Sequence, residues 1–287
     1  MKSLPFVLKS GAASLLAAGA LLAVVGSCTK SDDTPQYDVS VKTTTLGQVL
    51  AGENEKTLYF FTKDAAGTSA CVGACLTNWQ PFYKETLNLG PAVATADLST
   101  ITRADGAKQS TYKGWPLYYF KSDATTGDIK GDNVGGVWFA AKPHFSVMLA
   151  TGQLKGNDGK NYITTTTNVT NHTEGLGETT YLVDSLGRTL YAFVRDKKNK
   201  NAYTKADFSN NGNWPLAEFD AKNIPSGLSA ADFGVIDVFG KKQLTYKGWP
   251  VYYFGLDAGV RGINKGVSVP KPGDWPILNQ NTPAAPL

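Results

Sequence analysis

The sequence predicts an all-β protein made of two tandem, pseudo-symmetric β-rich repeats that pack together. The 287 residues include 30 Gly, 14 Pro and 11% aromatic side chains, a composition typical of short strands between turns. The pattern Tyr-x-Phe-x-x-Asp occurs four times. The gap between the second and third copies is longer than the other two gaps, which groups the copies into two pairs. A small, propeller-like ring of four modules is the alternative arrangement. The copies are Tyr59, Phe61 and Asp64; Tyr118, Phe120 and Asp123; Tyr191, Phe193 and Asp196; and Tyr252, Phe254 and Asp257.

Residues 1–27 are predicted to form a signal peptide. An apolar stretch of small residues follows the first lysines, and such a segment is removed on export. The run that ends at Cys28 resembles a bacterial lipobox, which implies that Cys28 is acylated and that this lipid anchors the protein to a membrane. The next residue is Thr29 and not Asp, which favours the outer membrane. Residues 30–33 resemble a basic-then-acidic tether that directs lipoproteins to the cell surface, and residues 28–39 form a polar tether.

The first repeat, residues 40–143, shows how the motif fits a strand. Tyr118 and Phe120 share one strand face, and Leu117 and Tyr119 share the other. Because both faces are apolar, we expect the strand to be central in its sheet. The Asp falls where the strand ends, and there its carboxylate can accept hydrogen bonds from turn amides. A buried Tyr hydroxyl needs a partner, such as a carboxylate or a backbone carbonyl. The motif is therefore predicted to be structural.

Cys71 and Cys75 are expected to form a disulfide, the default state of two nearby thiols in an oxidising compartment. A redox-active dithiol is the alternative, although the spacing is Cys-x3-Cys and not the thioredoxin-like Cys-x2-Cys. The matching stretch of the second half, residues 201–213, contains no Cys. The fold therefore does not require this bond.

Two other sets of residues are candidate ligand contacts. Asp123, Asp128 and Asp132 lie in an acidic loop that could supply oxygen ligands to Ca²⁺, although the loop lacks the alternation of an EF-hand. Trp115 and Trp249 each follow a Tyr-Lys-Gly turn. They are either core residues or exposed platforms for a ligand.

The chain carries no recognisable catalytic motif. His144 and His172 lie in no hydrolase or zinc pattern and are expected to be surface or linker residues. We therefore expect neither enzyme activity nor a cofactor. With 28 basic against 24 acidic side chains, the charge balance does not predict nucleic acid as a partner.

Residues 144–175 are predicted to connect the repeats as a folded segment with strands at 145–149 and 162–167. The second repeat spans residues 176–277. The C-terminal tail, residues 278–287, is rich in Pro and Ala and is expected to fray.

These motifs resemble those of a family of bacterial secreted-repeat lipoproteins that is characterised by a Tyr-x4-Asp pattern. The resemblance rests on the segments 57–64, 69–75 and 112–118, and it extends over about 40–143 and 176–277. The second half departs from the pattern because it lacks the Cys pair. The family has no assigned function, so the resemblance implies no particular activity.

The predicted function is a non-catalytic binding or structural module of the cell envelope. Its expected partner, besides the membrane, is an extracellular polymer or an envelope protein. The alternative is an accessory role in extracellular redox or metal handling that uses Cys71, Cys75 and the Asp residues. A hydrolase with paired Asp residues is a third hypothesis, which the lack of nearby His or Glu disfavours.

Overall fold

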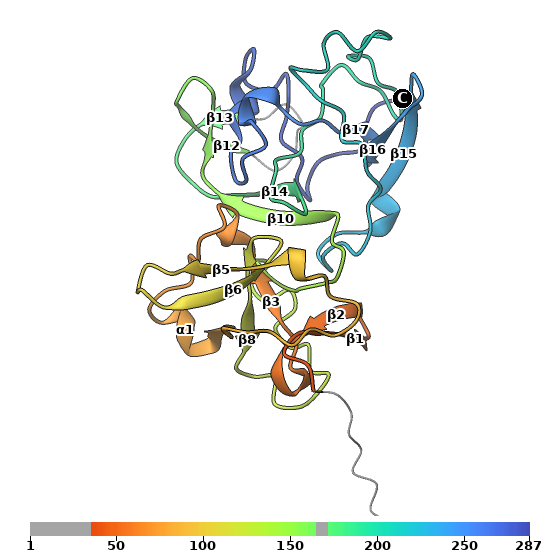
Figure 1. Cartoon of the computed structure of the whole chain (residues 1–287). Helices are drawn as coiled ribbons and strands as arrows, with labels where there is room; N and C mark the ends of the chain where they lie inside the picture. The colour runs from red at the N-terminus through yellow and green to blue at the C-terminus, as the bar shows by residue number, and fades with distance from the viewer. Residues whose placement is uncertain (1–35, 165–171) are drawn as a thin grey trace, which may run out of the picture. The chain divides into compact units, whose positions relative to one another are not determined.

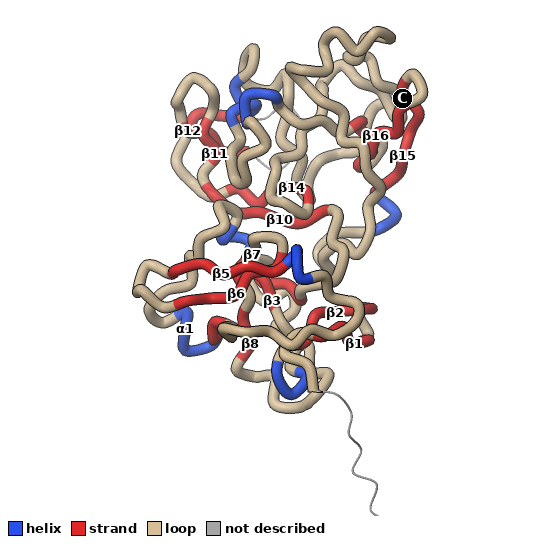
Figure 2. The backbone as a smooth tube through the Cα atoms, in the orientation of Figure 1, coloured by secondary structure: helices blue, strands red, loops and turns tan. Residues whose placement is uncertain are grey.

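Short antiparallel strands joined by long loops make up the structure, a computed structural model that describes residues 36–164 and 172–287 (Figure 1). The predicted signal peptide, the acylation site at Cys28 and most of the tether lie outside these residues. Strands and loops predominate over helical turns (Figure 2), so the prediction of a β-rich fold is confirmed. In the described part of the chain, no helix is long and apolar enough to cross a membrane.

The first half contains the strands β1 (Ser40–Thr44), β2 (Gly47–Ala51), β3 (Tyr59–Phe61), β4 (Trp79–Pro81), β5 (Leu98–Thr102), β6 (Lys108–Tyr112), β7 (Trp115–Pro116), β8 (Tyr118–Phe120) and β9 (Trp138–Ala140), the short helix α1 (Cys75–Asn78), and the 3-10 turns η1 (Glu53–Glu55), η2 (Thr62–Asp64) and η3 (Thr95–Asp97). Its main sheet has the order β4-β8-β3-β9, beside the smaller sheets β1-β2 and β5-β6-β7. The motif strands β3 and β8 are the inner strands of the main sheet, as expected for strands that are apolar on both faces.

The second half contains the strands β14 (Thr179–Asp184), β15 (Phe233–Val238), β16 (Lys241–Tyr246) and β17 (Trp249–Pro250), and the 3-10 turns η4 (Ala230–Asp232), η5 (Gly255–Asp257) and η6 (Lys265–Ser268). Isolated bridges join Leu216 to Tyr252, Tyr252 to Tyr191 and Tyr191 to Ile277. They reproduce the order β4-β8-β3-β9 with fewer regular pairs, and β15-β16-β17 reproduces β5-β6-β7. The two halves are therefore pseudo-symmetric. The described strands form several separate small sheets and not a ring of four equal modules.

The connecting segment consists of β10 (Val147–Gly152), β11 (Leu154–Lys155), β12 (Asn161–Thr164) and β13 (His172–Glu174). It is folded mainly onto the second half, because β10 pairs along its length with β14. The turn after β11 also bonds the second half, since Asn157 N donates to Lys265 O at 3.0 Å. The predicted strand at 145–149 starts at residue 147, and the end of the one at 162–167 lies outside the described residues.

The C-terminal tail is docked, so the expectation that residues 278–287 fray is wrong. The indole nitrogen of Trp249 donates to Pro283 O at 2.8 Å. In return, Ala285 N donates to Lys247 O at 2.9 Å. The Ala285 side chain is buried. The tail therefore supplies the carbonyl that this buried indole needs as a partner.

Arg261 joins the two halves. Its Nε donates to Ala65 O at 2.8 Å and its Nη1 to Lys113 O at 3.1 Å. Its guanidinium lies 4.9 Å from the Trp115 ring centroid. Gly114, at φ +76°, makes this approach possible, because a Cβ there would lie 1.9 Å from Arg261 Nη1. One side chain of the second half thus bonds two loops of the first.

Candidate functional site

Each motif tyrosine donates its hydroxyl proton to the aspartate of the other motif copy in the same half. Tyr59 Oη lies 2.6 Å from Asp123 Oδ2, and Tyr118 Oη lies 2.7 Å from Asp64 Oδ2. One copy of the motif cannot close its own pair, so the pairs form only when two copies lie side by side. The equivalent pairs of the second half are Tyr191 with Asp257, at 2.7 Å, and Tyr252 with Asp196, at 2.8 Å.

The other oxygen of each carboxylate accepts a turn amide. Asp64 Oδ1 accepts from Ala70 N at 2.7 Å, and Asp123 Oδ1 accepts from Lys130 N at 3.0 Å. This is the capping role that the sequence predicts for the motif Asp. In the second half, Asp196 accepts from Ala202 N at 2.7 Å and Asp257 from Lys265 N at 2.8 Å.

Burial raises the pKa of these carboxyl groups. Removal from water disfavours the charged form and outweighs the hydrogen bonds that favour it. The pKa of Asp64 and that of Asp196 rise to about 7, and the pKa of Asp257 rises to about 6. Burial raises the pKa of Asp123 as well. Asp64, Asp196 and Asp257 therefore exchange protons at pH values well above those of ordinary carboxyl groups.

Four stacked rings cross the core of each half. The first-half stack consists of Phe61, Trp138, Trp79 and Phe120, with ring centroids 4.1, 3.8 and 4.4 Å apart in that order. Its two indoles are parallel to within 4°. The second-half stack consists of Phe193, Trp275, Trp214 and Phe254, at 4.4, 3.7 and 4.4 Å.

The motif tyrosines stand edge-on to these indoles. The ring centroid of Tyr59 lies 5.5 Å from that of Trp79, and Tyr118 lies 5.0 Å from Trp138. The chain passes close above Tyr59 at Gly131, where a Cβ would lie 2.8 Å from the ring. The second half has the equivalent contacts Tyr191 with Trp214, at 5.4 Å, and Tyr252 with Trp275, at 5.1 Å.

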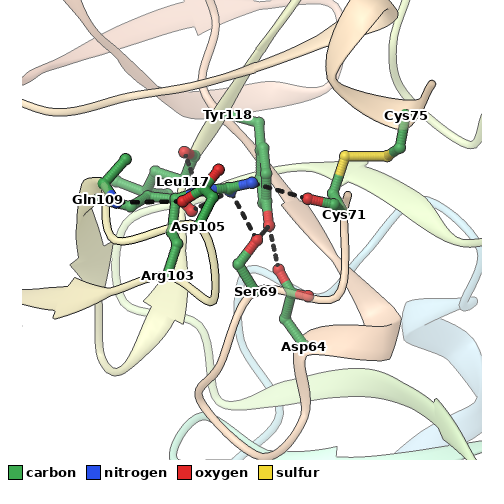
Figure 3. Close-up of polar contacts among 10 residues, drawn as sticks. Asp64, Ser69, Cys71, Cys75, Arg103, Asp105, Gln109, Leu117 and Tyr118 are labelled. Carbon is green, nitrogen blue, oxygen red and sulfur yellow. Dashed lines mark hydrogen bonds and ion pairs between the residues drawn. A yellow bond between two sulfur atoms is a disulfide. The ribbon is translucent and has the colours of Figure 1, made fainter. Parts of the chain in front are cut away.

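Arg103 organises a polar cluster in the first half (Figure 3). Its Nη1 donates to Ser69 Oγ at 2.7 Å and to Gln109 Oε1 at 2.8 Å. Its Nη2 donates to Cys71 O at 2.8 Å. In the second half, the equivalent Gln243 accepts instead from Asn201 Nδ2, at 2.8 Å. The guanidinium thus fixes the loop that carries the Cys pair.

Cys71 and Cys75 form the predicted disulfide, with Cα atoms 5.4 Å apart. Cys71 is buried and Cys75 is partly exposed. The disulfide lies beside the aromatic core, because Cys71 and Cys75 pack in the same cluster as Trp79, Tyr118 and Trp138.

The three candidate calcium ligands do not converge. Asp123 bonds Tyr59 as described above. Asp128 Oδ2 accepts from Ala124 N at 2.8 Å, and Asp132 Oδ1 accepts from Ala140 N at 2.9 Å. Among residues 36–164 and 172–287, no group of three or more His, Cys, Asp or Glu could hold a metal ion. These carboxylates are therefore used to shape the loop, and the calcium hypothesis is not supported.

Trp115 and Trp249 are not platforms for a ligand. They are 2% and 3% exposed, and their indole nitrogens donate to backbone oxygens, that of Trp115 to Ser185 O at 3.1 Å. The platform hypothesis is wrong because distant segments cover both rings.

His172 is buried, contrary to the expectation of a surface or linker residue. Its Nε2 accepts from Ile277 N at 3.3 Å, and burial lowers its pKa to about 4. It is therefore neutral at ordinary pH and acts as a packing residue of β13.

Two surface clefts occupy equivalent places in the two halves, and no sequence motif singled them out. The first cleft has a volume of about 510 Å³ and the second about 330 Å³. The sequence feature that could have predicted them is the second Tyr of each Tyr-Tyr-Phe segment, Tyr119 or Tyr253. In a strand, this residue faces away from the motif Tyr before it. The first cleft is lined by Glu53, Asn78, Gln80, Tyr119, Phe120 and Lys121, among others. The second is lined by Arg188, Pro215, Tyr253, Phe254, Gly255 and Asp257, among others.

A family described as a secreted repeat of unknown function matches residues 40–83 and 99–142. Each matched segment contains one copy of the motif, and both lie in the first half. The predicted resemblance is confirmed there, with a repeat unit shorter than expected. No curated protein and no solved structure is found to be similar to the chain.

Proposed function

Since the chain carries two copies of a secreted repeat with no assigned activity, we propose that it is a non-catalytic binding module of the cell envelope. A lipid on Cys28 holds it at the outer membrane or the cell surface. The two clefts are its ligand sites, and the ligand is an extracellular polymer.

The occurrence of a cleft at the same place in both halves carries this proposal. Tyr119 and Phe120 line the first cleft, and Tyr253 and Phe254, the equivalent residues, line the second. The motif Tyr residues, by contrast, are buried, and their hydroxyls bond the motif Asp carboxylates. Ligand contact therefore falls to the second Tyr and to the motif Phe of each Tyr-Tyr-Phe segment, and not to the motif Tyr.

The lining of the first cleft suits a neutral, hydroxyl-rich polymer such as a polysaccharide. The amides of Asn78 and Gln80 both donate and accept hydrogen bonds, and both residues are exposed. One acidic residue, Glu53, and two basic residues, Lys56 and Lys121, line the cleft, so a strongly charged chain of either sign would meet like charge there. An aromatic ring next to amides provides an apolar face beside polar contacts.

We expect that Asn78→Ala combined with Gln80→Ala weakens polysaccharide binding by about tenfold, which corresponds to about 1.4 kcal/mol. A glycan array identifies the probe oligosaccharide, and titration calorimetry measures its affinity. The matched control is Thr102→Ala on β5, at an exposed position outside the clefts. Equal affinity of the cleft variant and the control, or no glycan bound above background, would contradict the proposal.

Thiol–disulfide chemistry at Cys71 and Cys75 is a second candidate function, favoured by the partial exposure of Cys75. A small extracellular thiol would reduce the bond, and Arg103 would hold the loop meanwhile through Cys71 O. This candidate requires that the bond can be reduced while the fold stays intact.

Replacing both Cys by Ser is expected to lower the free energy of unfolding by only about 2 kcal/mol, since the loop that the bond closes is short. Denaturant unfolding measures this change. Under native conditions, thiol labelling after mild dithiothreitol should then modify both Cys without loss of the circular dichroism signal. Labelling that appears only as the protein unfolds would reject the second candidate.

A further inference from the structure

Each aromatic stack runs from the core to a surface cleft. Phe120, the last ring of the first-half stack, lines the first cleft, and Phe254 lines the second. Behind Phe120 lies Trp79, at a centroid distance of 4.4 Å, and behind that lies Trp138, at 3.8 Å. A molecule in either cleft is therefore separated from two parallel indoles by one aromatic ring.

Each indole also contacts a tyrosine that has a proton acceptor in place. Tyr118 stands against Trp138, and its hydroxyl lies 2.7 Å from Asp64 Oδ2. A phenol that loses one electron becomes strongly acidic, so it is oxidised readily only when a base within hydrogen-bond reach takes its proton. Asp64 in its ionised form meets that requirement, and so does ionised Asp123 for Tyr59, at 2.6 Å.

Each motif Asp caps a turn amide, but this role does not require a charged group, because the side-chain oxygen of Asn could accept the same bond. Burying a carboxylate costs free energy, and a neutral acceptor would hold a Tyr hydroxyl at lower cost. The raised pKa values of Asp64 and Asp196 reflect that cost. Nevertheless, a Tyr–Asp pair occurs at all four positions, although only the first half has the Cys pair. This repetition points to a shared need for a proton acceptor.

We propose that each half conducts single oxidising equivalents from its cleft, through the stacked indoles, to a tyrosine–aspartate pair. A one-electron outer-sphere oxidant takes an electron from the indole pair and is itself reduced. The indole radical cation then takes an electron from Tyr118, whose hydroxyl proton moves to Asp64 Oδ2. The products are a neutral tyrosyl radical and a protonated carboxyl group. A one-electron reductant, with return of that proton, restores the tyrosine. This activity does not depend on polymer binding in the clefts.

Pulse radiolysis with the azide radical as the oxidant tests the proposal, because this radical attacks indoles before phenols at neutral pH. In the purified protein, the indole radical should decay as the tyrosyl radical grows, at a rate independent of protein concentration. Replacing all four motif tyrosines by Phe keeps the rings and should abolish this growth. Replacing only Tyr59 and Tyr118 should remove about half of its amplitude. The matched control is Tyr83→Phe, which removes an exposed phenol outside the stacks and should leave the growth unchanged.

Asp64→Asn combined with Asp123→Asn tests the proton step separately. Asn keeps the shape of the side chain but has no carboxylate to receive the proton, so transfer in the first half should slow several-fold. Transfer in the unaltered protein should also slow in D₂O. Circular dichroism confirms folding of each variant. The proposal fails if the indole radical decays only through encounters between protein molecules, if tyrosyl growth survives the four Tyr→Phe changes, or if the Asn variants transfer at the original rate.

Discussion

Replacing Trp138 by Ala is expected to lower the free energy of unfolding by about 3–5 kcal/mol, the usual cost of deleting a large buried aromatic side chain. Trp138 is 5% exposed. It stacks between Trp79 and Phe61, at 3.8 and 4.1 Å, and it receives the edge of Tyr118 at 5.0 Å. The substitution therefore removes contacts to three rings at once and leaves a cavity between inner and outer strands of the main sheet. Denaturant unfolding followed by far-ultraviolet circular dichroism measures the change.

Trp275→Ala is the matched variant in the second half, where the same ring stacks on Trp214 at 3.7 Å. Because Arg261 bonds the two halves, we expect both variants to unfold in a single transition with similar losses. Trp138→Phe should cost less, since a ring remains in the stack. A loss below about 1 kcal/mol, the range of ordinary surface substitutions, would contradict the central place of the stack in the fold.

Local rules predict the strands and the caps of this fold. The alternation in Tyr-x-Phe predicts which side chains share a face, and the Asp at the strand end predicts a capped turn. Both features depend only on residues that are close in sequence. The Cys71–Cys75 disulfide follows in the same way from two thiols in one loop.

The partners of the buried polar groups could not be predicted locally. Tyr118 and Asp64 are 54 residues apart, and Tyr59 and Asp123 are 64 residues apart, so only the folded sheet brings them together. The same reason accounts for two wrong expectations. Trp115 finds its acceptor in the other half, and Trp249 finds its acceptor in the tail that was expected to fray.

A pair of repeats, and not a single one, is the closed structural unit of this chain. Each matched segment contributes one Tyr and one Asp, and each Tyr reaches the Asp of its neighbour. A lone unit would leave a buried phenol and a buried carboxylate unpaired, which costs free energy. This reciprocal bonding explains why the motif occurs in pairs, since each copy supplies the Asp that the Tyr of the other copy needs.

Lowering the pH from 8 to 5 is expected to stabilise the fold. The pKa of Asp64 and that of Asp196 are about 7 in the folded state, and that of Asp257 is about 6, against 3.8 for an ordinary Asp. Between these values the folded state holds protons that the unfolded state has lost, so stability falls as the pH rises. Each extra proton is worth about 1.4 kcal/mol per pH unit, and the total gain is on the order of a few kcal/mol. His172 acts in the opposite direction below its ordinary pKa of 6.5, because its pKa in the folded state is about 4, but it is one group against several.

The variant Asp64→Asn isolates the contribution of Asp64 to the pH dependence of stability from the contributions of all other titrating groups. Asn mimics the protonated carboxyl, because its oxygen can accept from Ala70 N while its amide donates to Tyr118 Oη, which can bond Ser69 Oγ in turn. The variant should match the unaltered protein in stability near pH 5 and exceed it near pH 8, with a flatter profile between. Asp220→Asn, at an exposed position, should leave the profile unchanged, and His172 contributes equally to all three proteins. A profile for Asp64→Asn that stays parallel to that of the unaltered protein would show that Asp64 keeps its charge between pH 5 and 8, and it would contradict the raised pKa of this group.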